Sequence, residues 1–201
     1  MLLDPDDSQL VLVDCQHRLI PALHEGQAVL ANAVRLATLA RMFEVPSWGT
    51  EHNPQGLGPT DPALRPLLDK VLPKMHFSAC AEGFGERLRP PARPQGGNAR
   101  SLPKHLQKPA QPQEEGRNTL VLAGCETHVC LLQTALDLLD EEFEVWVVTD
   151  ACGSRTERNR DAAFDRLAAA GAELVTTEMV AFEWLRTAEH PLFSEVLALV
   201  K

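Results

Sequence analysis

The chain has 201 residues, of which 44% are hydrophobic and 23% charged, as in an ordinary globular protein. This length suits one domain, over residues 1–201, with a central sheet covered by helices on both faces. The formal net charge of −9 argues against a nucleic acid or an anionic membrane as partner, because the general field repels phosphate. It leaves a small-molecule substrate open, since a local site can differ in sign from the whole.

Five cysteines, an odd number, lack the dense spacing of a disulfide framework, and several lie within apolar runs. A reducing compartment is the simplest setting for them. Residues 1–8 carry three aspartates and no apolar core, so they do not resemble a signal peptide. No stretch is long and apolar enough for a membrane span. We therefore expect a soluble, cytoplasmic protein.

The first half of the chain alternates strand-like and helix-like segments. Residues 10–13 form an apolar run that ends at Asp14, and a helix is expected over about 27–42. A short strand over 45–49 leads into a loop over 50–59. A turn of helix is expected over 64–68 and a strand over 71–74. The inner face of the first helix is expected to consist of Leu30, Ala33, Val34, Ala37 and Ala40.

The second half contains the clearest strand–helix–strand unit. Residues 119–124 form a buried strand, and the helix after it places Val129, Leu132, Leu136 and Leu139 on one face. Further strands are expected over 144–149 and 172–175, with a helix over 159–170 between them and a final helix that begins at Pro191. This alternation predicts an α/β fold with three α/β/α layers around a six-stranded parallel sheet.

Residues 87–117 do not fit this pattern, because they hold six prolines, seven basic residues and little apolar periodicity. The favoured interpretation is a flexible, basic, Pro-rich insertion on the surface. The alternative is a basic lid or a partner-docking arm near the rim of the active site.

Three reactive side chains fall at the ends of predicted strands. Asp14 closes the first strand, Lys74 the third, and Cys130 follows the fourth. A sheet of order 3-2-1-4-5-6 makes strands one and four neighbours at the switch point, where ligands of open parallel sheets bind. Asp14 and Cys130 are then expected to face each other.

Cys130 is expected in the first turn of a helix, where free N–H groups and the helix dipole favour a thiolate. Lys74 is expected to favour the thiolate further, and Asp14 to act as a general base. The same N–H groups can hold an oxyanion. Each residue taken alone is more often structural, and an apolar-flanked cysteine usually only packs.

Metal and nucleotide sites are not supported. Cys125, His128 and Cys130 lack a second ligand cluster, and His52 and His76 lack a metal-binding spacing. The Gly-rich stretch at 56–58 lacks the strand-to-helix setting of a phosphate loop. We expect no metal and no cofactor.

Several segments together resemble the isochorismatase-like cysteine hydrolases. Residues 124–135 look like the nucleophile segment of that family, 10–16 like its first strand with a D-x-Q ending, and 73–78 like its lysine segment. The resemblance continues through 147–155 and 176–179. It implies a triad of Asp14, Lys74 and Cys130, a cis peptide at Cys125–Glu126, and an oxyanion hole formed by the backbone N–H groups of Glu126 and Cys130.

The resemblance also implies a homo-oligomer, to which the apolar run at 180–185 either contributes or, equally, packs within its own subunit. Residues 50–54 lack the metal-binding pattern of the nicotinamidase branch. The retained triad favours acyl chemistry over vinyl-ether cleavage. The resemblance thus favours a metal-independent hydrolase that cleaves a small amide or related carbonyl substrate through a covalent cysteine acyl-enzyme. Residues expected to line its pocket are Gln16, Glu51, His76, Phe77 and Thr127.

Two other functions remain open on the same fold. One is a non-enzymatic interaction protein whose basic insertion docks a partner. The other is a thiol peroxidase or redox sensor, in which Cys125 would resolve an oxidised Cys130.

Overall fold

A computed structural model describes residues 2–89 and 116–201. Its centre is a six-stranded sheet in the order β3-β2-β1-β4-β5-β6, with parallel pairing between neighbours, which confirms the expected topology. The strands are β1 Ser8–Val13, β2 Ser47–His52, β3 Lys70–Lys74, β4 Thr119–Cys125, β5 Glu144–Gly153 and β6 Glu173–Val175.

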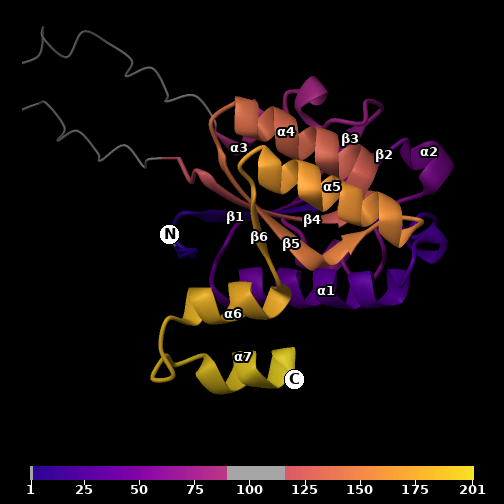
Figure 1. Ribbon diagram of the computed structural model, residues 1–201. Coiled ribbons are helices and arrows are strands. Elements are labelled where there is room, and N and C mark those ends of the chain that lie inside the picture. Colours follow the sequence, from indigo (N-terminus) through magenta and orange to yellow (C-terminus); the bar gives the residue numbers. More distant parts are fainter. Residues whose placement is uncertain (1, 90–115) are drawn as a thin grey trace, which may run out of the picture.

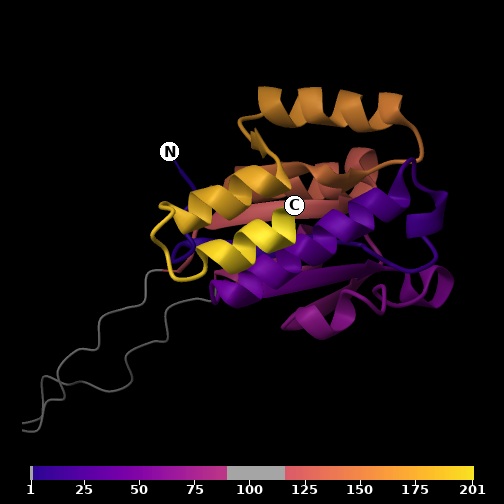
Figure 2. The same ribbon diagram turned by 90° about the horizontal axis from the view of Figure 1, so that it is seen from below.

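Helices cover both faces of the sheet and so complete the expected three layers (Figure 1). On one face lie α1 (Gly26–Met42), α6 (Thr177–Leu185) and α7 (Phe193–Val200), which Figure 2 shows in front of the sheet. On the other face lie α4 (Leu132–Asp140) and α5 (Glu157–Ala169). Two short helices, α2 (Pro54–Leu57) and α3 (Phe84–Leu88), belong to connections. None of the helices in the two described ranges combines the length and the apolar character needed to cross a bilayer.

The two central strands are buried along their whole length. All six residues of β1 and all seven of β4 are buried, because helices cover both of their faces. Gly124 lets these strands approach each other at their carboxyl ends. Its φ is +125°, and a Cβ atom there would lie 2.1 Å from the carbonyl oxygen of Val13. Only glycine fits such a position.

Some boundaries and faces differ from expectation. The expected loop at 50–59 is wrong at its start, because β2 continues to His52 through its pairing with β3. The buried face of α1 is turned from the expected one. Leu30 and Val34 are only partly buried, while Val29, Leu36 and Leu39 are in the core, because α6 and α7 as well as the sheet pack against α1.

The C-terminal region also differs. The run at 180–185 belongs to α6, a helix that the sequence interpretation did not include. Its members Val180, Ala181, Trp184 and Leu185 are buried within their own subunit. The last helix begins at Phe193 rather than at Pro191, because the residues before it form a turn.

The described flanks of residues 90–115 lie close together. The side-chain amide of Gln9 donates hydrogen bonds to the carbonyl oxygens of Leu88 and Arg117, each at 3.0 Å. Gln9 is near the start of β1, and Arg117 precedes β4. Both flanks are therefore at the amino-terminal edge of the sheet.

Candidate active site

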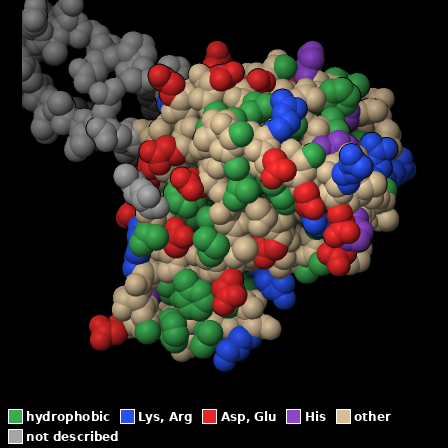
Figure 3. Space-filling model, viewed as in Figure 1, with side chains coloured by type: hydrophobic (Ala, Val, Ile, Leu, Met, Phe, Trp, Pro, Cys, Tyr) green, Lys and Arg blue, Asp and Glu red, His purple; other side chains and the backbone are tan. Residues whose placement is uncertain are grey.

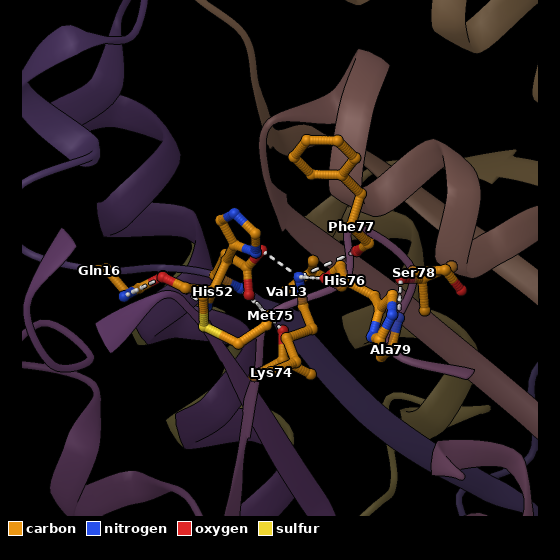
Figure 4. Close-up of polar contacts among 12 residues, drawn as sticks. Val13, Gln16, His52, Lys74, Met75, His76, Phe77, Ser78 and Ala79 are labelled. Atoms are coloured by element: carbon orange, nitrogen blue, oxygen red, sulfur yellow. Dashed lines mark hydrogen bonds and ion pairs between the residues drawn. The ribbon is translucent and has the colours of Figure 1, made fainter. Parts of the chain in front are cut away.

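A buried ion pair lies at the carboxyl edge of the sheet. Lys74 ends β3 and places its Nζ 2.8 Å from Oδ2 of Asp14, which follows β1, and both side chains have 0% exposure. Nζ also donates to the carbonyl oxygens of Phe77 at 2.9 Å and His76 at 3.3 Å. Figure 4 shows the Lys74 side chain reaching toward this stretch of main chain. These three contacts use all three donors of an ammonium group.

The second carboxylate oxygen of Asp14 is held by Thr50, a residue that sequence reasoning missed. The Thr50 hydroxyl donates to Oδ1 of Asp14 at 2.6 Å, and the amide of Asp14 bonds the Thr50 carbonyl oxygen at 3.1 Å. Asp14 has a φ of 49°, a left-handed conformation that aspartate tolerates better than most residues. The backbone and both carboxylate oxygens of Asp14 are thereby fixed. The available signal was that Thr50 comes directly after the strand predicted at 45–49.

Cys130 lies beside this ion pair, and both Asp14 and Lys74 change the pKa of its thiol. The pKa of the Cys130 thiol is raised from 9.0 to about 12, first by burial and next by the charge of Asp14, against the opposing effect of Lys74. The expectation of a resting thiolate is therefore wrong. Removal of the thiol from water, with only 6% of the residue exposed, outweighs the attraction of the lysine. The neutral thiol lies beside a carboxylate that can accept its proton.

Cys130, the expected nucleophile, lies in one tight turn at residues 126–131 between β4 and α4, the nucleophile turn. The Cys125–Glu126 peptide is cis, as the resemblance implies. Residues Thr127–Leu131 form a π-helical turn rather than the start of an α-helix. The carbonyl oxygen of Glu126 accepts hydrogen bonds from the amides of Val129 at 3.0 Å and Leu131 at 3.3 Å. Cys130 thus lies within the turn that also carries the expected oxyanion donors.

Two of the five expected pocket residues, Gln16 and Glu51, form hydrogen bonds within the protein. The side-chain amide of Gln16 donates to the carbonyl oxygens of His52 and Gly58 and accepts from the amide of His52. One oxygen of Glu51 accepts from both the amide and the hydroxyl of Thr60, at 2.7 and 2.8 Å. These bonds fix the loop after β2. We therefore do not retain Gln16 as a substrate contact, and Glu51 keeps one free oxygen at most.

The other three expected pocket residues lie in two places. Phe77 is 50% exposed, and its ring lies 5.3 Å from that of His52 between centroids (Figure 4). His76 is exposed and pairs with Glu82 at 2.9 Å. Thr127 is fully buried in the nucleophile turn. The Thr127 hydroxyl and Nδ1 of His52 are buried without a hydrogen-bond partner among the described residues.

Side chains after β5 hold the nucleophile turn from outside, and sequence reasoning assigned them no role. Nε of Arg155 lies 2.7 Å from Oε1 of Glu126. The Ser154 hydroxyl lies 2.9 Å from Nδ1 of His128, and the Asn159 side chain lies 3.3 Å from Nε2 of the same ring. Although Ser154, His128 and Asn159 form a chain of polar contacts, Ser154 is 1% exposed and so is closed to a substrate.

The pKa values of Cys80 and Cys125 are raised as well, so the pKa alone does not distinguish Cys130 from them. Burial raises the pKa of the Cys80 thiol to about 12, with the charge of Glu141 as the next cause. Cys125 is fully buried, and its hydrogen bond with Cys15, followed by burial, raises its pKa well above the usual range. A protonated, enclosed Cys125 is badly suited to act as a resolving thiol.

The expected insertion at 87–117, with its alternatives of a lid or a docking arm, is described only at its ends. Residues 90–115 lie outside the described ranges, and Leu88 and Arg117 are fixed by Gln9 at the amino-terminal edge of the sheet. The ion pair and Cys130 lie at the opposite edge. Within residues 2–89 and 116–201, no three His, Cys, Asp or Glu side chains are grouped as metal ligands.

Comparison with known proteins now adds to this geometry. Isochorismatase domain-containing protein 2B of mouse is 35% identical over 197 residues, which cover 98% of this chain and 82% of the mouse protein. The chain belongs to the isochorismatase family. The human isochorismatase domain-containing protein 2 is 34% identical, with 98% of this chain and 84% of the human protein covered. The family model of the isochorismatase domain matches residues 103–179.

Solved structures agree with this isochorismatase fold. The MAR1 ribonuclease of Caenorhabditis elegans has a TM-score of 0.82 and 29% identity, over 100% of this chain and 92% of that one. YcaC of Pseudomonas aeruginosa, with hexane-2,5-diol and covalent acrylamide, has a TM-score of 0.81 and 27% identity, over 98% and 91%. The Escherichia coli YcaC gene product, described as an octameric hydrolase of unknown specificity, has a TM-score of 0.81 and 28% identity, over 99% and 89%. The isochorismatase family membership supports a hydrolase fold.

Proposed function

We propose that this isochorismatase-family protein is a cysteine hydrolase that cleaves a small amide or a related carbonyl compound through a covalent acyl-enzyme. One observation carries the proposal: the thiol of Cys130 is buried beside the Asp14–Lys74 ion pair, and both partners act on its pKa. A carboxylate, an ammonium and a protected thiol have separate and compatible tasks in acyl transfer.

In the proposed first half-reaction, the S–H bond of Cys130 breaks and its proton passes to Asp14 while the sulfur attacks the carbonyl carbon. The backbone N–H groups of Glu126 and Cys130 stabilise the developing oxyanion. Lys74 holds the carboxylate in place and balances its charge. The C–N bond then breaks, and the leaving amine takes the proton from Asp14.

In the second half-reaction, Asp14 takes a proton from a water molecule as its oxygen attacks the thioester carbon. The C–S bond breaks, the carboxylic acid leaves, and Cys130 recovers its proton. Because the raised pKa keeps the thiol neutral at rest, proton transfer must accompany the attack. Asp14 therefore serves as the base in both half-reactions.

The chemical class of the substrate is inferred from the exposed side chains beside the Asp14–Lys74 pair. The exposed Phe77 ring, tilted by 36° against the ring of His52, offers an apolar face. A compact carbonyl compound with an apolar substituent matches this face. Although one structural neighbour is named a ribonuclease, the net charge of −9 disfavours a polyphosphate substrate. The covalent acrylamide on the Pseudomonas YcaC is consistent with a reactive nucleophile in a relative.

The test is mass spectrometry of the intact protein after exposure to a panel of small esters and primary amides. We expect one acyl group on Cys130 with esters, which acylate the thiol faster than the acyl-enzyme is hydrolysed, and turnover of at least one amide. Cys130→Ala should acquire no adduct, whereas Cys80→Ala should behave as the wild type. Equal labelling of wild type and Cys130→Ala would refute the proposal.

We further propose that the protein is a homo-oligomer, as its octameric E. coli relative is described to be. Apolar side chains gather over α6 and α7 at one end of the molecule (Figure 3). On α6, Met179 and Phe182 are 45% and 37% exposed, and with Leu2 they line a groove of about 420 Å³. Light scattering should give a mass several times that of the subunit, and Phe182→Glu should lower it. A wild-type mass equal to one subunit would contradict this proposal.

A further inference from the structure

We propose that the loop between β5 and α5 clamps the nucleophile turn, with Arg155 and Ser154 as positioning residues for the oxyanion donors. The inference rests on the proposed acyl-transfer function. It assigns a role in that function to side chains that do not touch the reacting atoms.

The first contact joins Arg155 to Glu126. The distance from Nε of Arg155 to Oε1 of Glu126 is 2.7 Å. The Glu126 side chain is 13% exposed, whereas that of Arg155 is 62% exposed. The carboxylate thus reaches outward from the turn while staying largely covered, and the arginine closes over it from the solvent side. Because Glu126 supplies one proposed oxyanion donor, its side chain connects that peptide to the neighbouring loop.

The second contact joins Ser154 to His128. The Ser154 hydroxyl lies 2.9 Å from Nδ1 of His128, and Asn159 at the start of α5 lies 3.3 Å from Nε2. Ser154 is itself fixed, since its carbonyl oxygen accepts a hydrogen bond from the amide of His24 at 2.9 Å. The imidazole is therefore held at Nδ1 by the anchored loop and at Nε2 by the first turn of α5.

Arg155 and Ser154 thus contact Glu126 and His128, which are two residues apart in the turn that carries both expected N–H donors. Asp14 and Lys74 act on Cys130 from β1 and β3, elements that Arg155 and Ser154 do not contact in these bonds. The clamp should accordingly affect the direction of the N–H groups and leave the environment of the thiol proton unchanged. This separation distinguishes a positioning role from a general structural one.

Two reactions of Cys130 separate the two effects. Acylation by p-nitrophenyl acetate develops an oxyanion, whereas alkylation by iodoacetamide does not. In Arg155→Ala and Ser154→Ala we expect acylation to slow by about tenfold and alkylation to change by less than about twofold, because small misplacements of oriented groups cost rate. Arg155→Lys keeps the charge and should recover part of the acylation rate. Arg160→Ala is the matched control, since Arg160 pairs only with Glu157 and Asp161 among the described acidic residues.

Hydrogen–deuterium exchange tests the clamp without any turnover. The peptide that contains residues 126–131 should exchange several times faster in Arg155→Ala than in the wild type, and at the wild-type rate in Arg160→Ala. Equal exchange in all three proteins would overturn the clamp. If the wild type is not acylated at all, the proposed function fails, while the exchange result still decides whether the loop holds the turn. A parallel fall in acylation and alkylation would overturn the positioning role in favour of a structural one.

Discussion

Asp14 and Lys74 are joined at 2.8 Å between Oδ2 and Nζ, although 60 residues separate them in the chain and neither side chain reaches solvent. Removing one partner leaves a buried charge without compensation. Lys74→Met should therefore lower the free energy of unfolding by about 3–5 kcal/mol. The double variant Asp14→Leu/Lys74→Met should recover part of that loss. Urea denaturation measures both, and a single variant as stable as the wild type would contradict a buried pair.

Thr50 should matter for activity more than its position on a strand suggests. Thr50→Val removes the hydroxyl that bonds Oδ1 of Asp14 at 2.6 Å while it keeps the shape of the side chain. We expect a loss of about 2 kcal/mol in stability, because the bond is made to a charged group. We also expect slower acylation of Cys130, because Asp14 loses one of its fixed contacts. Thr50→Ser retains the hydroxyl and should restore both properties, and its failure to do so would exclude a hydrogen-bonding role.

The reactivity of Cys130 should depend on pH in a defined direction. Because its pKa is raised from 9.0 to about 12, the thiolate fraction should keep rising with pH past 9, and alkylation by iodoacetamide should rise with it. A plateau of the alkylation rate near pH 9 would show that the thiol is not shielded. The same shift stabilises the folded protein below pH 9. That contribution falls between about pH 9 and 12, where the unfolded chain loses its thiol proton first.

Asp14→Asn should separate the charge of Asp14 from its role as a base. The Asp14 charge is the second cause that raises the pKa of Cys130, so its removal should lower that pKa and speed alkylation at neutral pH. Acyl hydrolysis should fall by at least about a hundredfold, since a general base contributes roughly 10²–10⁴-fold. A variant with slower alkylation and unchanged hydrolysis would contradict both assignments. Peptide mapping confirms that the label is on Cys130.

Gly124 should tolerate no side chain. In Gly124→Ala the new Cβ would lie 2.1 Å from the carbonyl oxygen of Val13, at a φ of +125°. We expect a loss of about 3 kcal/mol or more in unfolding free energy, from backbone strain and the clash between β1 and β4. Gly171→Ala is the matched control, because Gly171 has a φ of +102° but nothing within 4 Å of the added atom. Its cost should be about 1–2 kcal/mol.

The strands and their order were predictable because β1 and β4 are apolar runs with turn residues after them. Because ligands of open parallel sheets bind at the carboxyl ends of the strands, Asp14, Lys74 and Cys130 were also expected at that edge of the sheet. Thr50 was not predictable as a partner, since its bond to Asp14 depends on the register of β1 against β2. The hydrogen bonds of Gln16 and Glu51 were not predictable for a related reason. Polar residues at strand ends can face a ligand or the backbone, and spacing alone does not distinguish the two.

The π-helical turn and the helix α6 show two other limits. A first-turn cysteine was expected to be a thiolate, but the sequence does not report how far a turn is removed from water. Helix α6 begins at a threonine cap, whose hydroxyl accepts a hydrogen bond from the amide of Met179. That capping signal was present in the sequence, but the adjacent apolar run was interpreted as an interface or as packing within its own subunit, and not as a helix.

The bonds of Gln9 have a practical consequence. One side-chain amide fixes both Leu88 and Arg117, so the described residues on either side of 90–115 lie close together, on the edge away from Cys130. The free energy of closing such a connection changes only slowly with its length. This position therefore suits the insertion of a fluorescent reporter or an affinity tag, or the opening of new termini in a circular permutant, with the thiol chemistry left intact.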